Sequence, residues 1–402
     1  MSKKQEPVDI HALYQEALHL HYQGRPDEAI RLYSLVVSSV PEMAELHYNL
    51  GLAFFETEQF GLAAKAYRKA AELCPDDGDI LYNLGLAYKK DKRYAEAETA
   101  YLKALTIEPG STDIRYNLGC CYRDAGEVEQ ARRIFADLVN EEPDHLPAMN
   151  SLAYLTHLQG KYDQARELYE QVLKLDPDHA SARYMHSVLD GSSPDAPPQE
   201  YIRDLFDQYS ETFEKNLLED LEYNLYLDLR IQFDSIRQEK QVFDHALDLG
   251  CGTGLAGKTF RTACIRLSGV DLSPKMIEQA AGKNIYDALH VDDIVTFLRN
   301  SDALYDLFIA ADVLNYSGDL QPVFKAAAKQ SSSGALFCLS TEKSTEYGWS
   351  HQPTGRYAHH PDYVRQAAQE NGWRILLSAD SDMRREGDAR VRGTLFVLSR
   401  NR

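Results

Sequence analysis

The first half of the chain repeats one pattern of small, aromatic and proline positions every 34 residues. Small residues recur in two series, Ala17, Gly51, Gly85, Gly119 and Ala153, and Ala29, Ala63, Ala97, Ala131 and Ala165. Aromatic residues recur at Tyr33, Tyr67, Tyr101, Phe135 and Tyr169, and prolines at Pro41, Pro75, Pro109, Pro143 and Pro177. Small residues suit close helix crossings, aromatic side chains fill the space beside them, and proline ends a helix. The pattern predicts helix–turn–helix units at 10–43, 44–77, 78–111, 112–145 and 146–179, capped by a helix near 180–189.

The hydrophobic pattern changes near residue 190. Residues 190–198 read Asp-Gly-Ser-Ser-Pro-Asp-Ala-Pro-Pro, so we place a linker at 190–199 between domains 8–189 and 200–402. Beyond residue 240, short apolar runs alternate with amphipathic stretches. The runs lie at 246–250, 265–270, 288–291, 306–311, 334–340, 374–379 and 393–399. This alternation predicts a parallel sheet with helices on both faces and ligands at the carboxyl ends of its strands.

Composition and charge narrow the classes of partner. The 402 residues include 62 Asp and Glu against 43 Lys and Arg, a formal net charge of −19. Such a surface repels phosphate groups, so we expect no nucleic-acid partner and no docking on anionic membranes. The six cysteines form no C-x-x-C pair, which predicts neither a disulfide framework nor a metal site. With no signal peptide and no apolar run near the roughly 20 residues of a membrane span, the sequence predicts a soluble cytoplasmic protein.

A glycine-rich turn follows the first apolar run of the second half. Its residues are Asp248, Gly250, Gly252 and Gly254. Glycine adopts positive φ readily and lets a ligand approach the backbone. The turn also satisfies the G-x-G-x-x-G pattern of dinucleotide sites, with Asp271 at a suitable distance. However, the acid before the turn disfavours an anionic pyrophosphate, and a second acid pair, Asp292 and Asp293, follows the third run. A cationic ligand fits this arrangement better.

The 34-residue units resemble the tetratricopeptide repeat. The Leu-Gly-x-x-aromatic segments Leu50–Phe54, Leu84–Tyr88 and Leu118–Tyr122 carry the resemblance. One asparagine position recurs in Asn49, Asn83 and Asn117, and such a series can pair with an extended peptide in the concave groove. The stronger alternative is that Tyr-Asn-Leu-Gly is simply a common sequence of this repeat. Because the basic residues of a carboxylate clamp are missing, we expect a protein or peptide partner other than a chaperone tail.

The second half resembles the class I S-adenosylmethionine-dependent methyltransferases over residues 200–402. The resemblance implies a Rossmann-like α/β domain with a seven-stranded sheet, the last strand antiparallel, and S-adenosylmethionine as cofactor. It places Asp248 at the cofactor's ammonium end, the three glycines against the cofactor, and Asp271 on the ribose. It places Leu272, Met276, Asp293 or Asp292, and Ala310 on the adenine and methionine parts. Helix capping is an alternative role for the acids.

The acceptor side is expected after the fourth run and in a later insertion. Asp312, Asn315 and Tyr316 follow the fourth run, and the segment 355–363 holds Arg356, Tyr357, His359 and His360. Arg356 could bind a carboxylate, and Tyr316, His359 or His360 could act as base; alternatively, the histidines cap a helix. The helical segment 201–213 resembles the methyltransferase lead-in that closes over the cofactor, with Phe206, Tyr209 and Phe213 as lid residues, or it only joins the domains.

The whole chain resembles the predicted methyltransferases that contain tetratricopeptide repeats. The absence of an Asn/Asp-Pro-Pro-aromatic motif favours a small-molecule acceptor, although a protein recruited by the repeats is a second option. The expected function is methyl transfer from S-adenosylmethionine to an undefined acceptor. The alternative is a repeat scaffold whose methyltransferase-like domain only binds the cofactor.

Overall fold

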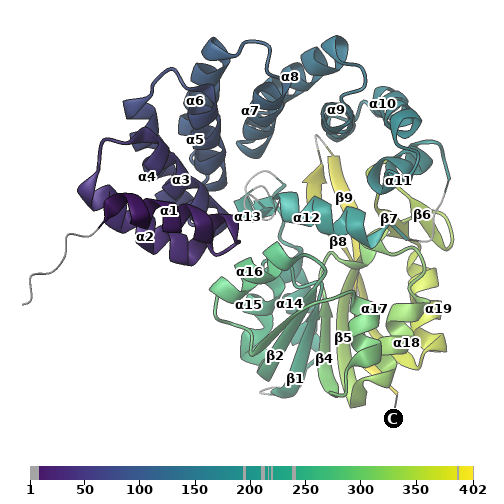
Figure 1. Ribbon diagram of the computed structural model, residues 1–402. Coiled ribbons are helices and arrows are strands. Elements are labelled where there is room, and N and C mark those ends of the chain that lie inside the picture. The colour runs from purple at the N-terminus through teal and green to yellow at the C-terminus, as the bar shows by residue number, and fades with distance from the viewer. Residues whose placement is uncertain are drawn as a thin grey trace, which may run out of the picture. The chain divides into compact units, whose positions relative to one another are not determined.

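The computed structural model describes residues 9–192, 196–209, 213–215, 217–218, 221–237, 241–386 and 389–401. The chain divides into two compact units, Met1–Gln159 and Gly160–Arg402 (Figure 1). The predicted linker at 190–199 lies inside the second unit, whose first helices carry the sequence pattern of the repeats. The predicted domain boundary at residue 190 therefore stays a prediction.

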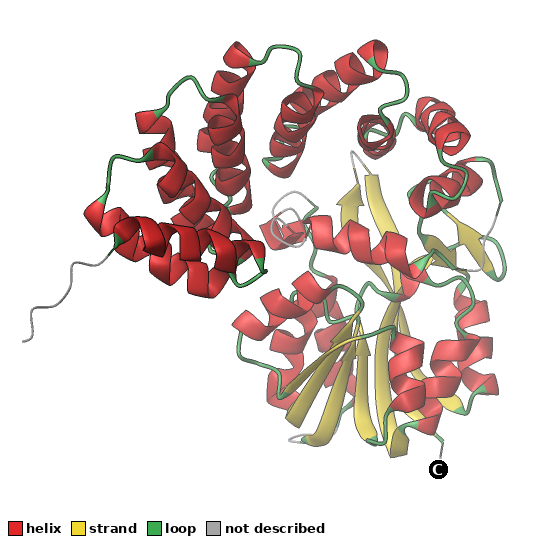
Figure 2. Ribbon diagram, viewed as in Figure 1, coloured by secondary structure: helices red, strands yellow, loops and turns green. Residues whose placement is uncertain are grey.

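The first unit consists of paired antiparallel helices that follow the 34-residue repeat (Figure 2). Its helices are α1 (Ile10–Tyr22), α2 (Pro26–Ser39), α3 (Ala44–Glu56), α4 (Phe60–Leu73), α5 (Gly78–Lys90), α6 (Tyr94–Ile107), α7 (Thr112–Asp124), α8 (Val128–Glu141) and α9 (Leu146–Leu158). Each second helix ends two residues before the recurring proline, because proline cannot continue the hydrogen-bonded ladder. These bounds confirm the predicted helical repeats.

Small and aromatic positions of the repeat meet across each helix pair. A Cβ atom added at Gly51 or Gly85 would lie 2.6 Å from the ring of Tyr67 or Tyr101, and one at Gly119 would lie 2.6 Å from Phe135. These three rings are fully buried. The glycine is therefore required because the ring occupies the space of a side chain, which explains why the two series share one period. Burying each ring stabilises the unit by about 1.5–3 kcal/mol.

The second unit begins with two helices and continues as an α/β domain. Its helices are α10 (Tyr162–Leu175), α11 (Ala180–Leu189), α12 (Gln199–Tyr209), α13 (Phe213–Lys215), α14 (Leu225–Ile236), α15 (Leu255–Phe260), α16 (Pro274–Gly282), α17 (Ile294–Asn300), α18 (Gln321–Lys329) and α19 (Pro361–Glu370). Its strands are β1 (Phe243–Leu249), β2 (Cys264–Asp271), β3 (Ala288–Val291), β4 (Tyr305–Ala310), β5 (Ser331–Lys343), β6 (Trp349–His351), β7 (Tyr357–His359), β8 (Trp373–Glu386) and β9 (Ala389–Arg400).

The sheet has the predicted parallel core with an antiparallel last strand. The order β3-β2-β1-β4-β5 is parallel throughout, β9 runs antiparallel to β5, and β8 pairs with the outer side of β9. These seven strands match the prediction. The short hairpin β6–β7 was not predicted, since three-residue strands leave little periodicity to detect. It pairs with β5 through Glu342 and Lys343, beyond the end of the main core.

Helices lie on both faces of this sheet (Figure 2), and an apolar cluster fills the space between helices and sheet on each face. On one face, Leu247 and Leu249 of β1 pack with Phe324 of α18 and with Trp373. On the other face, Ala246 packs with Phe233 of α14 and Phe260 of α15. Because both faces are buried, the central strands are continuously apolar, as the sequence pattern indicated. Polar residues gather instead where the parallel strands end.

Candidate active site

The glycine turn leaves the carboxyl end of β1 and begins α15. Gly250, Gly252 and Gly254 all have positive φ, of 64°, 51° and 94°. The amide of Gly252 donates a hydrogen bond of 2.8 Å to Asp271 at the end of β2. A Cβ atom added at Gly252 would meet no atom within 4 Å, so the backbone borders open space at this residue, whereas Gly250 and Gly254 face the side chains of Val313 and Tyr286. A ligand can therefore approach the backbone at Gly252, and the contact of the turn with a cofactor stays a prediction.

Asp271 joins three segments at this edge of the sheet. Its second oxygen accepts a 2.9 Å hydrogen bond from the amide of Ser273, whose hydroxyl in turn caps α16 at Met276. The Ser273 hydroxyl donates to Asp207 on α12 over 2.5 Å. Burial raises the pKa of Asp271, although the backbone hydrogen bonds from Ser273 and Gly252 oppose this rise. The carboxylate is thus fixed by backbone donors before any ligand arrives.

Asp248 lies beneath the turn and is only 1% exposed. One of its carboxylate oxygens accepts a 2.7 Å hydrogen bond from the hydroxyl of Tyr286. The other oxygen is buried and meets no hydrogen-bond criterion within the described part of the chain, although the backbone of Gly257 also lowers the pKa of this acid. Burial raises the pKa of Asp248 to about 7, against the effect of the Tyr286 hydrogen bond, which lowers it. A buried carboxylate with one open oxygen is suited to a cationic ligand.

The remaining residues predicted to bind cofactor lie at the ends of the adjoining strands. Met276 is buried and Leu272 is half-buried beside it, and Ala310 ends β4. Asp293 caps α17, since its carboxylate accepts a 2.9 Å hydrogen bond from the amide of Thr296. Asp292 accepts one of 2.8 Å from the amide of Asp293. Asp293 thus has the helix-capping role that was the alternative, whereas Asp292 supports the capping residue from outside the helix, and the contact of both acids with a cofactor stays a prediction.

Helix α12 is attached to the cofactor side and to the acceptor side. Its Asp207 carbonyl accepts a 3.2 Å hydrogen bond from the side chain of Lys275 on α16. Its Phe206 ring packs edge-on against Tyr316, with 5.3 Å between centroids, and lies 6.0 Å from Phe213. These contacts fit the predicted lid. Tyr209 ends the helix, but its side chain lies outside the described part of the chain.

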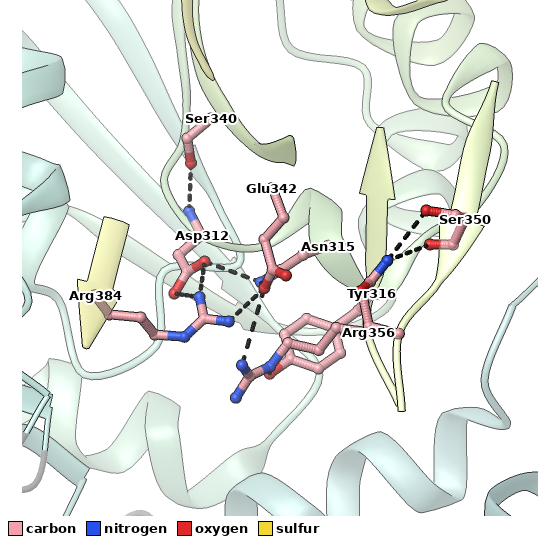
Figure 3. Close-up of polar contacts among 9 residues, drawn as sticks. Asp312, Asn315, Tyr316, Ser340, Glu342, Ser350, Arg356 and Arg384 are labelled. Carbon is pink, nitrogen blue, oxygen red and sulfur yellow. Dashed lines mark hydrogen bonds and ion pairs between the residues drawn. The ribbon is translucent and has the colours of Figure 1, made fainter. Parts of the chain in front are cut away.

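A buried ionic cluster occupies the predicted acceptor side (Figure 3). Arg384 of β8 is 2% exposed and lies between two carboxylates, donating to Asp312 over 3.1 Å and to Glu342. The side-chain amide of Asn315 donates to the same two acids, over 2.9 Å and 3.2 Å. Arg356 approaches Glu342 at 3.9 Å. We call these five residues the ionic cluster.

The two acids of the ionic cluster differ in their titration. Burial raises the pKa of Asp312, and the neighbouring Arg384 and Arg356 offset this rise only in part. Burial also acts on Glu342, but the same two guanidiniums outweigh it and lower the pKa of Glu342. Glu342 is therefore the carboxylate that the arginines hold ionised. Asp312, with φ of 57°, keeps its strained backbone because its amide donates a 2.9 Å hydrogen bond to Ser340.

Tyr316 and Arg356 lie at the outer end of the ionic cluster (Figure 3). The Nε of Arg356 donates a 3.3 Å hydrogen bond to the Tyr316 hydroxyl. The Arg356 side chain keeps 23% of its surface exposed, against 2% for Arg384. The structure thus brings together Asp312, Asn315, Tyr316 and Arg356, as the sequence led us to expect.

The two histidines and Tyr357 are placed for packing. His359 is fully buried, and its Nε2 lies 2.8 Å and 3.0 Å from the carbonyl oxygens of Ser317 and Gly318, to which it donates. Burial lowers the pKa of His359 to about 4. His360 caps α19 by accepting a 3.2 Å hydrogen bond from Asp362. Tyr357 is fully buried in the hairpin. These roles disfavour the predicted catalytic use of the histidines and substrate contact by Tyr357.

The hairpin that carries Arg356 rests on helix α11. The Tyr184 hydroxyl lies 2.9 Å from Nε2 of His351 and donates to the carbonyl oxygen of Gly355 at 2.9 Å. Its ring also lies 5.0 Å from that of Tyr201. The helix expected to cap the repeats thus contacts the segment that bears the predicted acceptor residues.

The recurring asparagines of the first unit bind tyrosines of the preceding repeat. The amide groups of Asn49, Asn83 and Asn117 donate to the hydroxyls of Tyr14, Tyr48 and Tyr82 over 2.9, 3.2 and 2.9 Å. These hydrogen bonds connect successive repeats, so the series has a structural role. Its predicted contact with a peptide stays a prediction.

Sequence reasoning did not identify four residues that shape this site: Tyr184, Tyr286, Glu342 and Arg384. Glu342 could have been identified from the sequence, because it lies two residues after the apolar run 334–340. An acid at such a place marks the carboxyl end of a strand, as Asp271 does after the run 265–270. Arg384 lies in a polar stretch that gives no such signal. Tyr286 and Tyr184 look like ordinary aromatic packing positions in the sequence.

Comparisons with known proteins agree with this architecture. Family models described as tetratricopeptide repeat match residues 14–78, 66–99, 90–153 and 148–179, and one described as methyltransferase domain matches residues 247–337. The chain is 30% identical over 78 residues to nodulation protein S of Rhizobium tropici. That match covers 19% of this chain and 32% of the relative, so the chain spans about a third of the relative's length.

Two solved structures are similar to parts of the chain. The N-methyltransferase NodS of Bradyrhizobium japonicum, in complex with S-adenosyl-L-homocysteine, has 16% identity and a TM-score of 0.41 over 50% of this chain and 98% of its own. The tetratricopeptide protein YrrB has 21% identity and a TM-score of 0.40 over 44% and 91%. From the family models, the chain joins tetratricopeptide repeats to a methyltransferase domain.

Proposed function

We propose that the second unit transfers a methyl group from S-adenosylmethionine to an acceptor bound beside Tyr316 and Arg356. The observation that carries this proposal is the backbone of the glycine turn at Gly252, which borders open space and is fixed by its hydrogen bond to Asp271. Asp248 adds a buried carboxylate with an open oxygen at the same place. Open backbone with two acids suits a ligand that presents a cationic end and a ribose diol.

The residues present fit this cofactor. Asp248 would face the ammonium group, Asp271 the ribose hydroxyls, and the turn the body of the cofactor. Leu272, Met276, Ala310 and the pair Asp292 and Asp293 would line the rest of the site. When bound, the sulfonium supplies an activated methyl group and a neutral leaving group, so the chain needs mainly to align the acceptor and exclude water.

The acceptor site is built from the outer end of the ionic cluster. Arg356 offers a guanidinium that would bind a carboxylate or another anionic group of the acceptor. The Tyr316 hydroxyl, beside it, would orient the methyl-accepting atom, while Phe206 of α12 covers the Tyr316 ring. Asp312 and Asn315 support this arrangement from inside the ionic cluster. The acceptor is a small molecule or a protein that the repeats recruit in the cytoplasm.

Calorimetric titration of the full chain with S-adenosylmethionine tests cofactor binding. Asp271→Ala removes the acid assigned to the ribose, so we expect the affinity to fall by about 100-fold, the loss of two charge-assisted hydrogen bonds. The matched control is Asp302→Ala, which removes an exposed carboxylate of the same unit and should leave the affinity unchanged. Equal binding by the Asp271 variant and the unmodified protein contradicts the cofactor assignment.

Methyl transfer is tested with the same two variants and methyl-labelled cofactor on cell extract. Label should pass to an extract component with the unmodified protein and with Asp302→Ala, but not with Asp271→Ala. Tight cofactor binding without any transfer favours the alternative, a scaffold that only binds the cofactor.

A further inference from the structure

Tyr286 lies beneath the glycine turn although nothing in its sequence context indicates a role there. It belongs to the loop between α16 and β3, and its hydroxyl donates the 2.7 Å hydrogen bond to Asp248. Its ring fills the space where side chains of the turn region would lie. A Cβ atom added at Gly257 would lie 2.1 Å from the hydroxyl oxygen, and one at Gly254 would lie 3.1 Å from the ring. Turn and ring are therefore built against each other.

The loop that carries Tyr286 is fixed from its other side. The carboxylate of Asp287 accepts a 2.8 Å hydrogen bond from the amide of Leu267, and the amide of Asp287 donates to the carbonyl oxygen of Leu267 at 2.8 Å. Arg261 approaches the same carboxylate at 3.5 Å. These contacts join the loop to β2, so residues of the protein itself hold the segment that carries Tyr286.

We propose that Tyr286 is a positioning residue of the cofactor site, whose hydroxyl holds the Asp248 carboxylate ionised and leaves its second oxygen open toward the cofactor's ammonium group. This inference rests on the proposed function. A tyrosine hydroxyl that donates to a carboxylate stabilises its charged form, which a fully buried acid otherwise loses. The hydrogen bond also fixes which oxygen is left without a hydrogen bond among the described residues, and this second oxygen is buried beneath the turn.

The charged and titratable groups that face Asp248 determine the pH range of the effect. They are Tyr286 itself, Cys251 of the turn, Asp271 at the end of β2, and Tyr223 in front of α14. Burial raises the pKa of Cys251 and of both tyrosines well above their ordinary values, so these three stay neutral near pH 7. Asp271 acts as a nearby acid, and it raises the pKa of Asp248.

Tyr286→Phe tests the proposal because it keeps the ring and removes the hydroxyl. Without its donor, Asp248 should titrate about one pH unit higher. The dissociation constant for S-adenosylmethionine should then rise about fivefold at pH 7 and approach tenfold at pH 6, and the difference should vanish by pH 9. The amino group of the cofactor titrates in this range as well, but alike for both proteins, so the ratio of the two constants isolates the protein.

Two further variants separate this role from a packing role. Tyr305→Phe removes another buried hydroxyl of the same unit, one that contacts Ser301. This variant should have the same dissociation constant for S-adenosylmethionine as the unmodified protein at every pH. Asp248→Asn keeps the shape of the acid without its charge. Adding Tyr286→Phe to Asp248→Asn should then cause no further loss at any pH, because the hydroxyl acts through the carboxylate.

The outcomes distinguish this inference from the proposed function. Failure of the unmodified protein to bind S-adenosylmethionine at any pH overturns the proposed function. Binding by the unmodified protein, together with a Tyr286→Phe ratio that is constant across pH, overturns the positioning role alone. An additional loss in the Asp248→Asn background also overturns it.

Discussion

Arg384 is the buried cation that balances Asp312 and Glu342 at the acceptor side. Its Nη atoms contact both acids, and 2% of its surface is exposed. Because the ion pairs are buried, Arg384 stabilises the fold mainly by neutralising the charge of the two acids. Removal of Arg384 would leave uncompensated charge in a medium of low dielectric constant. Arg392 of β9 is a matched contrast, because it pairs with Asp382 at the surface.

Arg384→Leu should lower the free energy of unfolding by about 3–5 kcal/mol. The control Arg392→Leu should cost less than about 1 kcal/mol, as expected for an exposed pair. Urea unfolding followed by tryptophan fluorescence measures both, since Trp349 and Trp373 are the two tryptophans of the chain and both lie in the second unit. Equal effects of the two substitutions contradict the compensating role.

The same substitution should show a characteristic dependence on pH. In Arg384→Leu the buried acids Asp312 and Glu342 lose their main cationic partner and have a raised pKa in the folded state, so the folded protein takes up protons more readily than the unfolded chain. The contribution of these two acids to the stability of the variant is then fully present below their unfolded pKa near 4, and it is lost as the pH rises through their folded pKa. Its deficit relative to the unmodified protein should therefore shrink between pH 8 and pH 5.

At the scale of elements, the hairpin β6–β7 contacts α11, the last helix that carries the repeat pattern. It lies where a further repeat would otherwise pack. Tyr48, Tyr82, Tyr116 and Tyr184 share one position of the 34-residue pattern. Tyr48 and Tyr82 accept hydrogen bonds from asparagines of the following repeat. Tyr184 instead contacts His351 and Gly355 of the hairpin. The tyrosine at this position of the pattern thus joins its helix to the next element in each case. For Tyr184, that element is the hairpin segment that carries Arg356.

Tyr184→Phe should loosen this hairpin. Loss of about 1 kcal/mol of hydrogen bonding should speed amide hydrogen exchange over residues 349–359 by about fivefold, while cofactor affinity stays unchanged. The control Tyr305→Phe makes the same chemical change on β4 and should leave exchange in the hairpin as it was. Unchanged exchange in the Tyr184 variant shows that the hairpin is held without α11.

At the scale of the whole molecule, the compact units do not coincide with the turn-rich segment at 190–199. Helices α10 and α11 belong to the unit that contains the sheet. None of the described helices combines the length and apolarity that a bilayer crossing requires. Because α10 and α11 belong to the unit that contains the sheet, the place at which the chain is cut matters for any experiment that removes the repeats.

Two truncated chains should behave differently. A chain that begins at Gly160 keeps α11, so its hairpin should exchange amide hydrogens at the rate of the full protein. One that begins at Asp190 lacks Tyr184 and should show fast exchange over residues 349–359, with cofactor affinity within about twofold of the full chain in both cases. If the chain that begins at Gly160 still transfers the methyl group, the acceptor is a small molecule. If this chain loses transfer, the acceptor is a protein recruited by the repeats.

The sequence by itself determined the features that arise from contacts between near neighbours. The 34-residue series predicted the helical repeats because each glycine meets a ring only 16 positions further along, as Gly85 meets Tyr101. The turn at Gly250–Gly254 and the acid Asp271 were predictable because a strand, a tight turn and a helix follow one another directly. In a parallel sheet the ends of such strands must meet at one edge.

Tertiary structure alone decided which partners complete the site. Arg384 meets Asp312 across 72 positions, Tyr286 meets Asp248 across 38, and Tyr184 meets His351 across 167. No local pattern records these pairs, because each is set by the order of strands in the sheet and by the helices that cover it. The sequence could therefore indicate the acids that face a cofactor, whereas only the fold shows which side chains hold them in place.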